Sequence, residues 1–404
     1  MMLTYEQARR TVIEQSQKAA RPHATATISV WDALGFVLAE DVKTDRPYPP
    51  FDRSTRDGFA LRAAEAVPGA KLPCVGEIKA GDSVTAPLKA GTCVQIMTGA
   101  AVPAGADAVM MLEHTRREGD TVHFDRAASA GQNVVPRGSE ARSEQTILSS
   151  GQRLGYAELA LAAQVGATQL RCANKPRVAI LSTGDEVVSI DEAPGPFQIR
   201  NSNSVSLAVQ VRLAGGQPVP LGNAADRVED LRAKIERGLK EDVLVLSGGV
   251  SMGKYDLVET VLKDLGAEFY FDAVSIRPGK PAVFGKCGDT LVFGLPGNPV
   301  STMVTFELFV TPALDLLSGA PARDLPLVEA RLGEALHEKP GLAHFLPARV
   351  EWSGTTPQVK ALRWQGSGDI IALAQANCFL VVAAGRSRID VGETVPILLR
   401  KDIV

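Results

Sequence analysis

The sequence predicts a multidomain protein of the α/β-plus-β class: a mostly parallel three-layer α/β domain, an inserted β-rich domain and a C-terminal β barrel. Its 404 residues exceed the size of one ordinary domain. Residues 177–317 alternate short, fully apolar runs with amphipathic ones, which is typical of a parallel sheet covered by helices on both faces. The segments on either side consist of short apolar runs separated by Gly- and Pro-containing turns, which indicates β structure.

The first element expected is a helix over residues 4–18. Thr4 and Gln7 have the spacing of a capping box, and apolar residues recur behind them at helical intervals. A second, Ala-rich helix is expected over Gln152–Leu170, beside the N-terminal segment. Residues 1–44 and 144–174 would then form one extended discontinuous domain, although the first helix has the alternative of packing on the α/β domain.

The three remaining domains are predicted from changes in the pattern of apolar and turn-forming residues along the chain. Residues 45–143 alternate short apolar runs with tight turns and form the inserted β-rich domain. Residues 175–325 form the α/β domain. Its strands are expected at Val178–Leu181, Gln217–Leu221 and Val243–Leu246, with a strand pair near residues 282–284 and 291–293, and its helices at Ser204–Leu213, Asp226–Leu239, Asp256–Leu265 and Val300–Leu317. Asp226 would be the N-cap of its helix, and residues 326–404 would form the barrel.

Composition excludes several classes of function. The 43 Lys and Arg residues nearly balance 46 Asp and Glu, so a net charge of −3 offers no general attraction to nucleic acid or an anionic membrane. The N-terminal residues lack the pattern of a secretory signal, and no apolar stretch reads as a membrane span. The five cysteines are odd in number and scattered, which is typical of reduced thiols in a cytoplasmic protein. The five histidines form no zinc-binding pair, so any metal is expected to be an oxygen-preferring one such as Mg²⁺.

Three loops that follow apolar strands carry the strongest functional signal. They are Ser182-Thr183-Gly184-Asp185-Glu186, residues 247–253 (SGGVSMG) and residues 294–301 (GLPGNPVS), and the last opens a helix. Ligands of open parallel sheets bind at the carboxyl ends of the strands. Glycine lets backbone N–H groups approach an anion, and carboxylates beside a phosphate imply a shared Mg²⁺. Each loop alone could be a simple turn, and the acids a solvated cap, but three on one sheet favour a ligand site.

Two further segments carry weaker signals. Arg277 and Lys280 place two cations in one turn, where they would bind an oxyanion, with a charged surface turn as the alternative. Residues 49–60 are dense in polar groups and read equally well as a domain junction. The chain has neither a dinucleotide fingerprint after a strand nor a Walker motif, so those nucleotide sites are not supported.

Taken together, these segments resemble the molybdopterin molybdenumtransferase family (MoeA and the gephyrin E domain). The matching motifs occur in the family's order along nearly the whole chain: PFDxSxxDGFA from Pro50, TGA from Thr98, STGDE from Ser182, SGGVSxG from Ser247, RPGKP from Arg277 and GLPGNPVS from Gly294. The resemblance implies an elongated homodimer with the active site near the subunit interface, and an α/β domain like that of molybdopterin adenylyltransferases. It implies insertion of molybdate into adenylylated molybdopterin, with Mg²⁺-dependent cleavage of the pyrophosphate and release of AMP.

The resemblance also implies roles for particular residues. Glu186 and Asp256 would hold the metal, with Asp226 as a third acid if it is not simply a helix cap. Arg277, Lys280 and Ser301 would form the oxyanion pocket, and Asp57 and Thr98 would come from the partner subunit. Residues expected to bind the substrate or its anionic groups are Ser182, Thr183, Gly184, Asp185, Gly248, Gly249, Ser251, Pro296, Gly297 and Asn298. Glu140 is a further candidate.

The chain departs from the family pattern at three positions without losing a required chemical group. Arg56 stands where an apolar residue or Lys is usual, Glu140 replaces Asp, and Arg277 replaces a common Lys. Two alternative functions follow from the same family: a non-catalytic molybdopterin-binding scaffold and a paralogue resembling molybdopterin adenylyltransferases. The implied partners are a molybdopterin adenylyltransferase as substrate donor and molybdoenzymes or their chaperones as acceptors.

Overall fold

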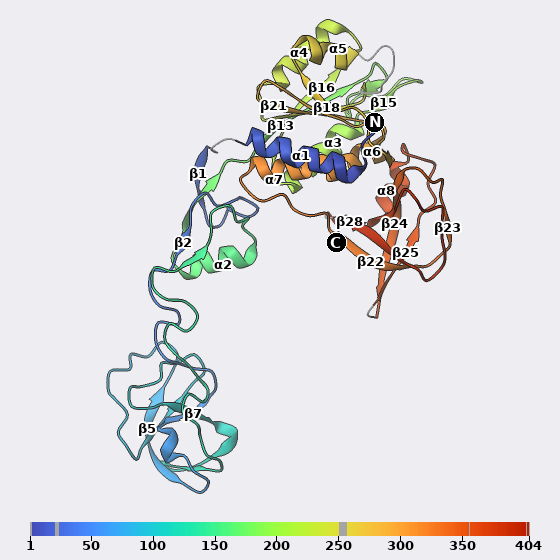
Figure 1. Ribbon diagram of the computed structural model, residues 1–404. Coiled ribbons are helices and arrows are strands. Elements are labelled where there is room, and N and C mark those ends of the chain that lie inside the picture. Colours follow the sequence, from blue (N-terminus) through green and yellow to red (C-terminus); the bar gives the residue numbers. More distant parts are fainter. Residues whose placement is uncertain (1, 21–23, 250–256, 355, 401, 404) are drawn as a thin grey trace.

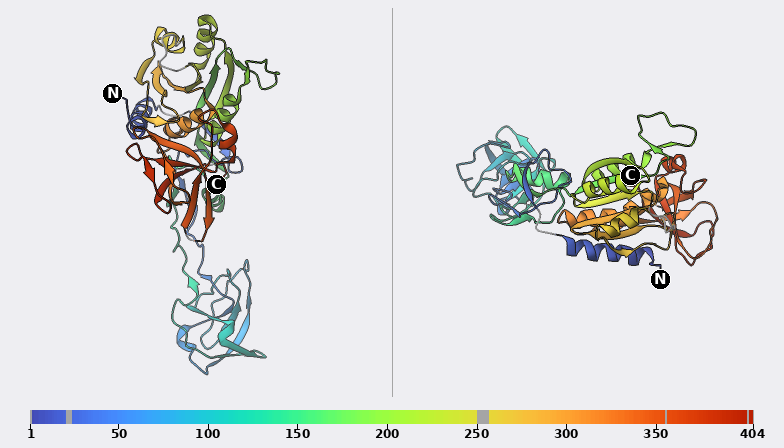
Figure 2. Two further views of the ribbon diagram at one scale, coloured as in Figure 1. Left: turned by 90° about the vertical axis from the view of Figure 1, so that its right-hand side faces the viewer. Right: turned by 90° about the horizontal axis from the view of Figure 1, so that it is seen from above.

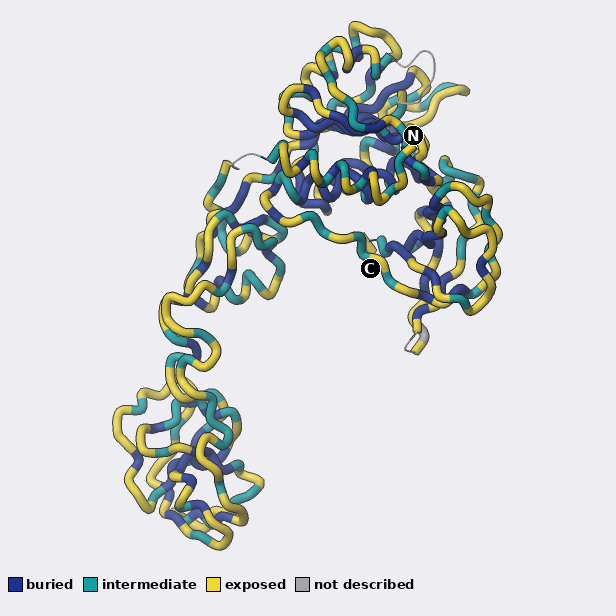
Figure 3. Tube along the Cα trace, viewed as in Figure 1, coloured by how far each residue is buried: buried dark blue, intermediate teal, exposed yellow. Residues whose placement is uncertain are grey.

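The protein is described from a computed structural model, which covers residues 2–20, 24–249, 257–354, 356–400 and 402–403. Two predicted site residues, Ser251 and Asp256, lie outside these ranges. Figures 1 and 2 show an elongated chain with a β-rich unit at one end, a narrow connection made of two chain segments, and a larger body that carries the barrel. Buried residues are concentrated in the larger body and at the centre of the β-rich unit, while the connection is mostly exposed (Figure 3).

The first helix, α1 (Tyr5–Ala19), begins at the predicted capping box. The Thr4 hydroxyl accepts from the Gln7 N–H, and the Gln7 side chain accepts from the Thr4 N–H. Its buried face, which includes Ala8 and Val12, packs against α7 (Thr311–Leu317). The helix therefore packs on the α/β domain, the alternative position that the sequence left open.

The segments before and after the inserted unit pair with each other. Strand β1 (Thr25–Ser29) lies antiparallel to β12 (Gln169–Ala173), and β2 (Val42–Lys43) lies antiparallel to β11 (Thr146–Leu148). The second predicted helix is shorter than expected. Helix α2 spans only Tyr156–Gln164, because Gly166 has a positive φ of 76° that ends the helix, and the chain then enters β12.

The inserted unit contains a six-stranded sheet of order β7-β4-β6-β5-β9-β8. Its elements are β4 (Gly58–Leu61), η1 (Ala63–Glu65), β5 (Lys71–Ile78), β6 (Cys93–Ile96), β7 (Ala108–Met111), η2 (Leu112–His114), β8 (Thr115–Glu118) and β9 (Thr121–Phe124). Gly58 permits the tight pairing of β4 with β7, because a Cβ there would lie 1.9 Å from the Met110 carbonyl oxygen. The connection to the body is braced by β3 (Arg53–Ser54), which pairs with β10 (Val134–Val135).

The α/β domain is built on a mostly parallel sheet, as predicted, and this sheet has six strands. The order is β16-β13-β17-β21-β20-β18; the first four strands are parallel, β20 is antiparallel to β21, and β18 is antiparallel to β20. The strands are β13 (Arg177–Thr183), β16 (Gln217–Ala224), β17 (Val243–Ser247), β18 (Glu268–Phe271), β20 (Val283–Cys287) and β21 (Thr290–Leu295), and a short pair, β14 (Val187–Val188) and β15 (Ile199–Arg200), projects from the first loop.

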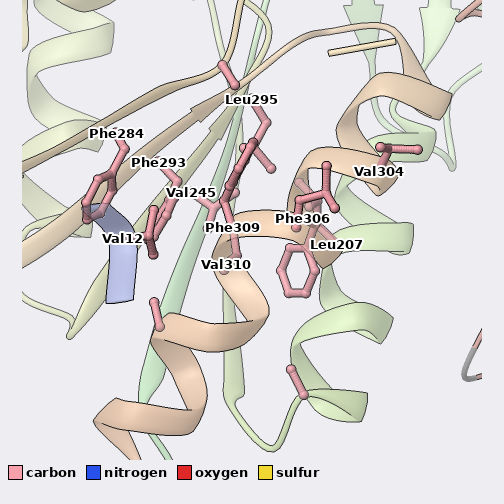
Figure 4. Packing of buried hydrophobic residues seen from close by; sticks show 14 of the residues in the cluster. Val12, Leu207, Val245, Phe284, Phe293, Leu295, Val304, Phe306, Phe309 and Val310 are labelled. Carbon is pink, nitrogen blue, oxygen red and sulfur yellow. The ribbon is translucent and has the colours of Figure 1, made fainter. Parts of the chain in front are cut away.

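Helices cover both faces of this sheet. Helices α4 (Val228–Gly238) and α5 (Leu257–Asp264) bury Leu231, Ile235 and Val261 on one face. On the other face lie α1, α3 (Ser202–Leu213) and the continuous helix Pro299–Leu317, whose Phe306 and Phe309 sit in the large core shown in Figure 4. This last helix consists of α6 (Pro299–Thr305), a π-helical segment η3 (Phe306–Val310) and α7.

The helix Pro299–Leu317 is long and apolar enough by composition to cross a membrane, contrary to the expectation that no apolar stretch reads as a membrane span. In the structure 78% of its most apolar window is buried inside the protein. Its apolar character is therefore explained by packing between the sheet, α1 and α3.

The predicted N-cap role of Asp226 is wrong. Helix α4 begins at Val228, its N-cap position is Arg227, and no side chain caps it. The acid that accepts a backbone hydrogen bond near the start of this helix is Asp230, which binds the Ala225 N–H. Asp226 is therefore available for another role, which its position at the carboxyl end of β16 suggests.

The C-terminal domain is a barrel, as predicted, and it is closed by five strands. Pairings run β24-β25-β22-β28-β26 and close through β26 with β24, and β19 (Ile276–Arg277) adds to the edge of β24. Its elements are β22 (Leu327–Leu332), β23 (Leu336–His337), β24 (Ala343–Ser353), β25 (Thr356–Ala361), α8 (Ile370–Gln375), β26 (Cys378–Val382), β27 (Arg388–Ile389) and β28 (Thr394–Leu399). All five cysteines of the chain are buried and free: Cys74, Cys93, Cys172, Cys287 and Cys378.

Candidate active site

A cavity of about 710 Å³ lies at the carboxyl ends of β13, β17 and β21. The three predicted loops all contribute to it, because the parallel strands deliver their ends to one edge of the sheet. The predicted residues that line this cavity, called here the main cavity, are Ser182, Thr183, Gly184, Glu186, Asp226, Gly248, Gly249, Pro296, Gly297 and Asn298.

Glycine is required where the first two loops meet. Gly248 and Gly249 have positive φ values of 88° and 60°. A Cβ on Gly248 would lie 2.8 Å from the Thr183 carbonyl oxygen, and one on Gly249 would lie 2.6 Å from the Thr183 hydroxyl. Both strain and space thus exclude other residues, and the loops approach each other through bare backbone.

The backbone groups available to an anion are fewer than predicted. The Gly248 N–H donates to the Leu295 carbonyl at 3.2 Å, so it is already used. The N–H groups of Gly249, Gly297 and Asn298 make no hydrogen bond within the described part of the chain. These three donors, together with the buried Thr183 hydroxyl, which also has no partner there, are free to meet ligand oxygens.

Three carboxylates gather at the rim of the main cavity. Asp226 and Glu186 line it, and Asp185 accepts a hydrogen bond of 3.0 Å from the Asp226 N–H. Desolvation, and then repulsion by Asp185 and Glu186, raise the pKa of Asp226 above its ordinary value. Asp226 is therefore close enough to Asp185 and Glu186 to be repelled by both, although no group of three metal-ligating side chains in the described ranges is tight enough to hold a metal alone.

A second cavity, of about 340 Å³, adjoins the first and shares Pro281, Pro296 and Asn298 with it. Its lining includes Arg277, Lys280 and Ser301, so the structure brings together the three residues predicted for the oxyanion pocket. We call it the oxyanion chamber. Its other walls come from the C-terminal domain, through Leu342, Trp364, Gly366 and Ser367.

Several lining residues were not predicted. Asn201 caps α3 through the Ser204 N–H and accepts from the Ser182 hydroxyl at 3.0 Å. The Asn203 Nδ2 donates to the Gly297 carbonyl at 2.7 Å, while its Oδ1 is buried and unpaired within the described residues. The sequence did contain a signal, since Asn-Ser-Asn-Ser at the start of a helix is a capping run, but the helix was expected to begin at Ser204.

The barrel contributes to both cavities through one loop. Ser367 accepts from the Asn298 Nδ2 through its hydroxyl at 2.8 Å and from the Val300 N–H through its carbonyl at 3.0 Å. Gly368 and Ile370 continue this loop into the lining of the main cavity. Sequence patterns did not point to these residues, because their role depends on the docking of one domain on another.

Asp57 and Thr98 form a pair far from these cavities within the same chain. The Asp57 carboxylate accepts from the Thr98 N–H at 2.6 Å and from the Thr98 hydroxyl at 2.8 Å. Both belong to the inserted unit at the other end of the molecule (Figure 1). These bonds, first from the N–H and then from the hydroxyl, hold the pKa of Asp57 below its ordinary value, so the exposed carboxylate remains ionised at lower pH.

Replacing Thr98 with valine is expected to raise the pKa of Asp57 toward its ordinary value. The variant loses the hydroxyl donor but retains the backbone N–H, so the shift is upward and incomplete. If the ionised carboxylate is required, the acid limb of the activity profile moves to higher pH. Carbon-13 NMR titration of Asp57 measures the shift directly; an unchanged titration would show that the hydroxyl contributes nothing.

Glu140 lies in the connection between the inserted unit and the body. Its carboxylate is 3.2 Å from Arg53 Nη2, and both side chains are about half exposed. The pair joins the two chain segments of the connection, away from the two cavities. A structural role therefore explains its position.

Comparison with known proteins decides the family. A molybdopterin molybdenumtransferase from Nostoc sp. is 34% identical over 93% of this chain and 88% of its own length. The chain belongs to the MoeA family of molybdopterin molybdenumtransferases. Its residues 3–166 match the MoeA N-terminal region (domain I and II), residues 179–316 match the probable molybdopterin binding domain, and residues 329–399 match the MoeA C-terminal region (domain IV).

Other relatives agree with this assignment. The molybdopterin molybdenumtransferase of Bacillus subtilis is 32% identical over 94% of this chain and 90% of its own. The crystal structure of the molybdopterin biosynthesis MoeA protein from Pyrococcus horikoshii superposes with a TM-score of 0.82 at 26% identity, covering 99% of this chain and 100% of that one. This chain therefore shares the fold of that MoeA protein over nearly all of its residues.

Proposed function

We propose that the protein is a molybdopterin molybdenumtransferase that inserts molybdate into adenylylated molybdopterin and releases AMP. The observation that carries this proposal is the pair of adjoining cavities. The main cavity joins free N–H groups to a carboxylate cluster, which suits a pyrophosphate with a divalent cation. The oxyanion chamber beside it places Arg277 and Lys280 where a dianion would lie.

The acidic cluster fits Mg²⁺. Mg²⁺ commonly takes one or two carboxylates and completes its coordination with water and substrate phosphates. Glu186 and Asp226 supply such oxygens. Desolvation, and then repulsion by Asp185 and Glu186, raise the pKa of Asp226, and a bound cation would favour its ionised form. When bound, the ion would neutralise charge developing on the phosphate oxygens; the chain's own contribution is to hold the pyrophosphate with the Gly249, Gly297 and Asn298 N–H groups.

A homodimer is part of this proposal. Asp57 and Thr98 lie in the inserted unit, away from the cavities of their own chain, so a second copy would have to deliver them. The body also exposes large apolar side chains that an interface would cover. Val205, Val209 and Leu213 form a stripe along α3, and Trp31 and Tyr156 are about nine-tenths exposed.

We further propose a cytoplasmic location, in keeping with five free cysteines. A molybdopterin adenylyltransferase would supply the substrate, and molybdoenzymes or their chaperones would accept the product. The acids argue against a purely scaffolding role, since desolvation, and then repulsion by Asp185 and Glu186, disfavour the ionised form of Asp226, and a bound cation would favour it.

The test is a reconstitution with purified protein. AMP should be released from adenylylated molybdopterin only when Mg²⁺ and molybdate are both present, and chromatography of the nucleotides measures it. Omitting either ion serves as the control. Release of AMP without molybdate would indicate a simple hydrolase, and no release under complete conditions would contradict the transferase proposal.

A further inference from the structure

The two cations of the oxyanion chamber have different surroundings. Lys280 is exposed and has no ion-pair partner in the described part of the chain. Arg277, whose side chain is about half exposed, faces the carboxylate of Glu338 from the barrel domain. Among the residues that the structure describes, the chamber therefore contains one cation without an ion-pair partner and one that faces an acid.

The backbone of Arg277 is attached to the barrel. Strand β19 lies parallel to β24, with Arg277 opposite His344 and Ile276 opposite Ala343. The Ala343 N–H donates to the Ser275 carbonyl at 3.0 Å, and the Ser275 hydroxyl donates to the Gly341 carbonyl at 3.2 Å. The Arg277 turn is thus hydrogen-bonded to residues 341–344 of the barrel domain.

Glu338 is held on its other side by His344. His344 is 2% exposed, and its Nδ1 lies 2.9 Å from a Glu338 carboxylate oxygen. The contact does not have hydrogen-bond geometry, so His344 restrains the carboxylate by close packing. The Nε2 lies 3.1 Å from the Lys339 carbonyl, and the Glu338 N–H donates to the Ser387 carbonyl at 2.9 Å, which fix the ring and the acid.

The distance between the Glu338 carboxylate and the Arg277 guanidinium determines whether Arg277 can still bind a ligand. The same carboxylate oxygen that contacts His344 lies 4.0 Å from Arg277 Nη1. That separation is too long for a hydrogen bond, so the N–H groups of Arg277 remain free for a ligand. The electrostatic attraction nevertheless restrains a long side chain that would otherwise lose conformational entropy on binding.

We propose that Glu338 and His344 are positioning residues that aim Arg277 into the oxyanion chamber. The barrel domain thereby contributes to anion recognition through a carboxylate that does not itself touch the anion. This inference rests on the proposed function for its ligand, a tetrahedral oxyanion of the molybdate class, and it deepens that function by naming residues that control the site.

The experiment measures molybdate and sulfate binding by calorimetry in full-length protein. Glu338→Gln keeps the size of the side chain and removes its charge, and it should weaken binding of both anions roughly three- to tenfold. The Michaelis constant for molybdate should rise by the same factor while kcat and the constant for adenylylated molybdopterin change little. Glu338→Asp should restore part of the affinity. Glu334→Gln removes another barrel carboxylate, paired with Lys360 at 3.3 Å, and should have no effect.

The decisive comparison repeats Glu338→Gln in an Arg277→Gln background. If Glu338 acts through Arg277, the second substitution should add no further loss. An equal loss in both backgrounds, or unchanged affinity in folded Glu338→Gln protein, would overturn the inference. If wild-type protein binds sulfate through Arg277 but does not bind molybdate, molybdate is not its ligand, and the positioning role of Glu338 is still supported. If no anion binding depends on Arg277, both the proposed ligand and the positioning role are refuted.

Discussion

Replacing Glu186 with glutamine is expected to lower the rate of AMP release by at least about a hundredfold, a loss typical of removing one electrostatic contact to the reacting group. The amide has nearly the size of the carboxylate but no charge to attract a divalent cation. Because Glu186 is exposed at the rim of the main cavity, the fold should be unaffected. Single-turnover measurement of AMP over a range of Mg²⁺ concentrations tests this, and the apparent Mg²⁺ requirement should rise.

The matched control is Glu192→Gln. Glu192 is an exposed carboxylate in the same projecting segment but does not line the main cavity. It should retain wild-type activity and Mg²⁺ dependence. If Glu186→Gln were as active as this control, Glu186 would not be a metal ligand and the acidic cluster would need another explanation.

The second large effect concerns Asp57. Asp57→Asn should abolish activity when both subunits carry the substitution, although residue 57 lies far from the cavities of its own chain. Co-expression of Asp57→Asn with Glu186→Gln should restore about a quarter of wild-type activity. Half of the dimers would be mixed, and in each of them one of the two composite sites would combine an intact Glu186 with the partner's intact Asp57.

This complementation distinguishes two arrangements of the site. Differently tagged subunits allow the mixed dimer to be purified and assayed against each parent variant. Asp52→Asn, which alters a neighbouring carboxylate that accepts from the Arg137 N–H, serves as the control for damage to the inserted unit. Inactive mixed dimers that are correctly folded would mean that Asp57 and Glu186 do not share a site across the interface.

Local sequence patterns predicted local structure well. Thr4 and Gln7 form the predicted capping box because their contacts span only three residues. The alternation after Arg177 predicted the parallel sheet, and the meeting of three Gly-rich loops followed, because parallel strands must end at one edge. The capping pattern gave a wrong prediction for Asp226. Its sequence context is that of an N-cap, but in the structure it lies beside Asp185 and Glu186.

Features that depend on how domains dock could not be predicted in this way. Ser367 is more than 60 residues from Asn298 in the chain, yet it orders the start of the helix that lines both cavities. Glu338 and His344 belong to a barrel strand and its preceding loop, and no motif marks them. Only the pairing of β19 with β24 brings them to Arg277.

The sequence by itself determined the architecture, the family resemblance and the acidic, Gly-rich nature of the site, because these depend on periodicity and on residues close together in the chain. The tertiary structure decided which backbone donors remain free, since the Gly248 N–H is already used by Leu295. It also separated Asp57 from Glu186 within one chain and placed a barrel carboxylate behind Arg277. The physical reason is the same in each case: hydrogen bonds and ion pairs between distant segments depend on the packing of whole domains, which no local pattern records.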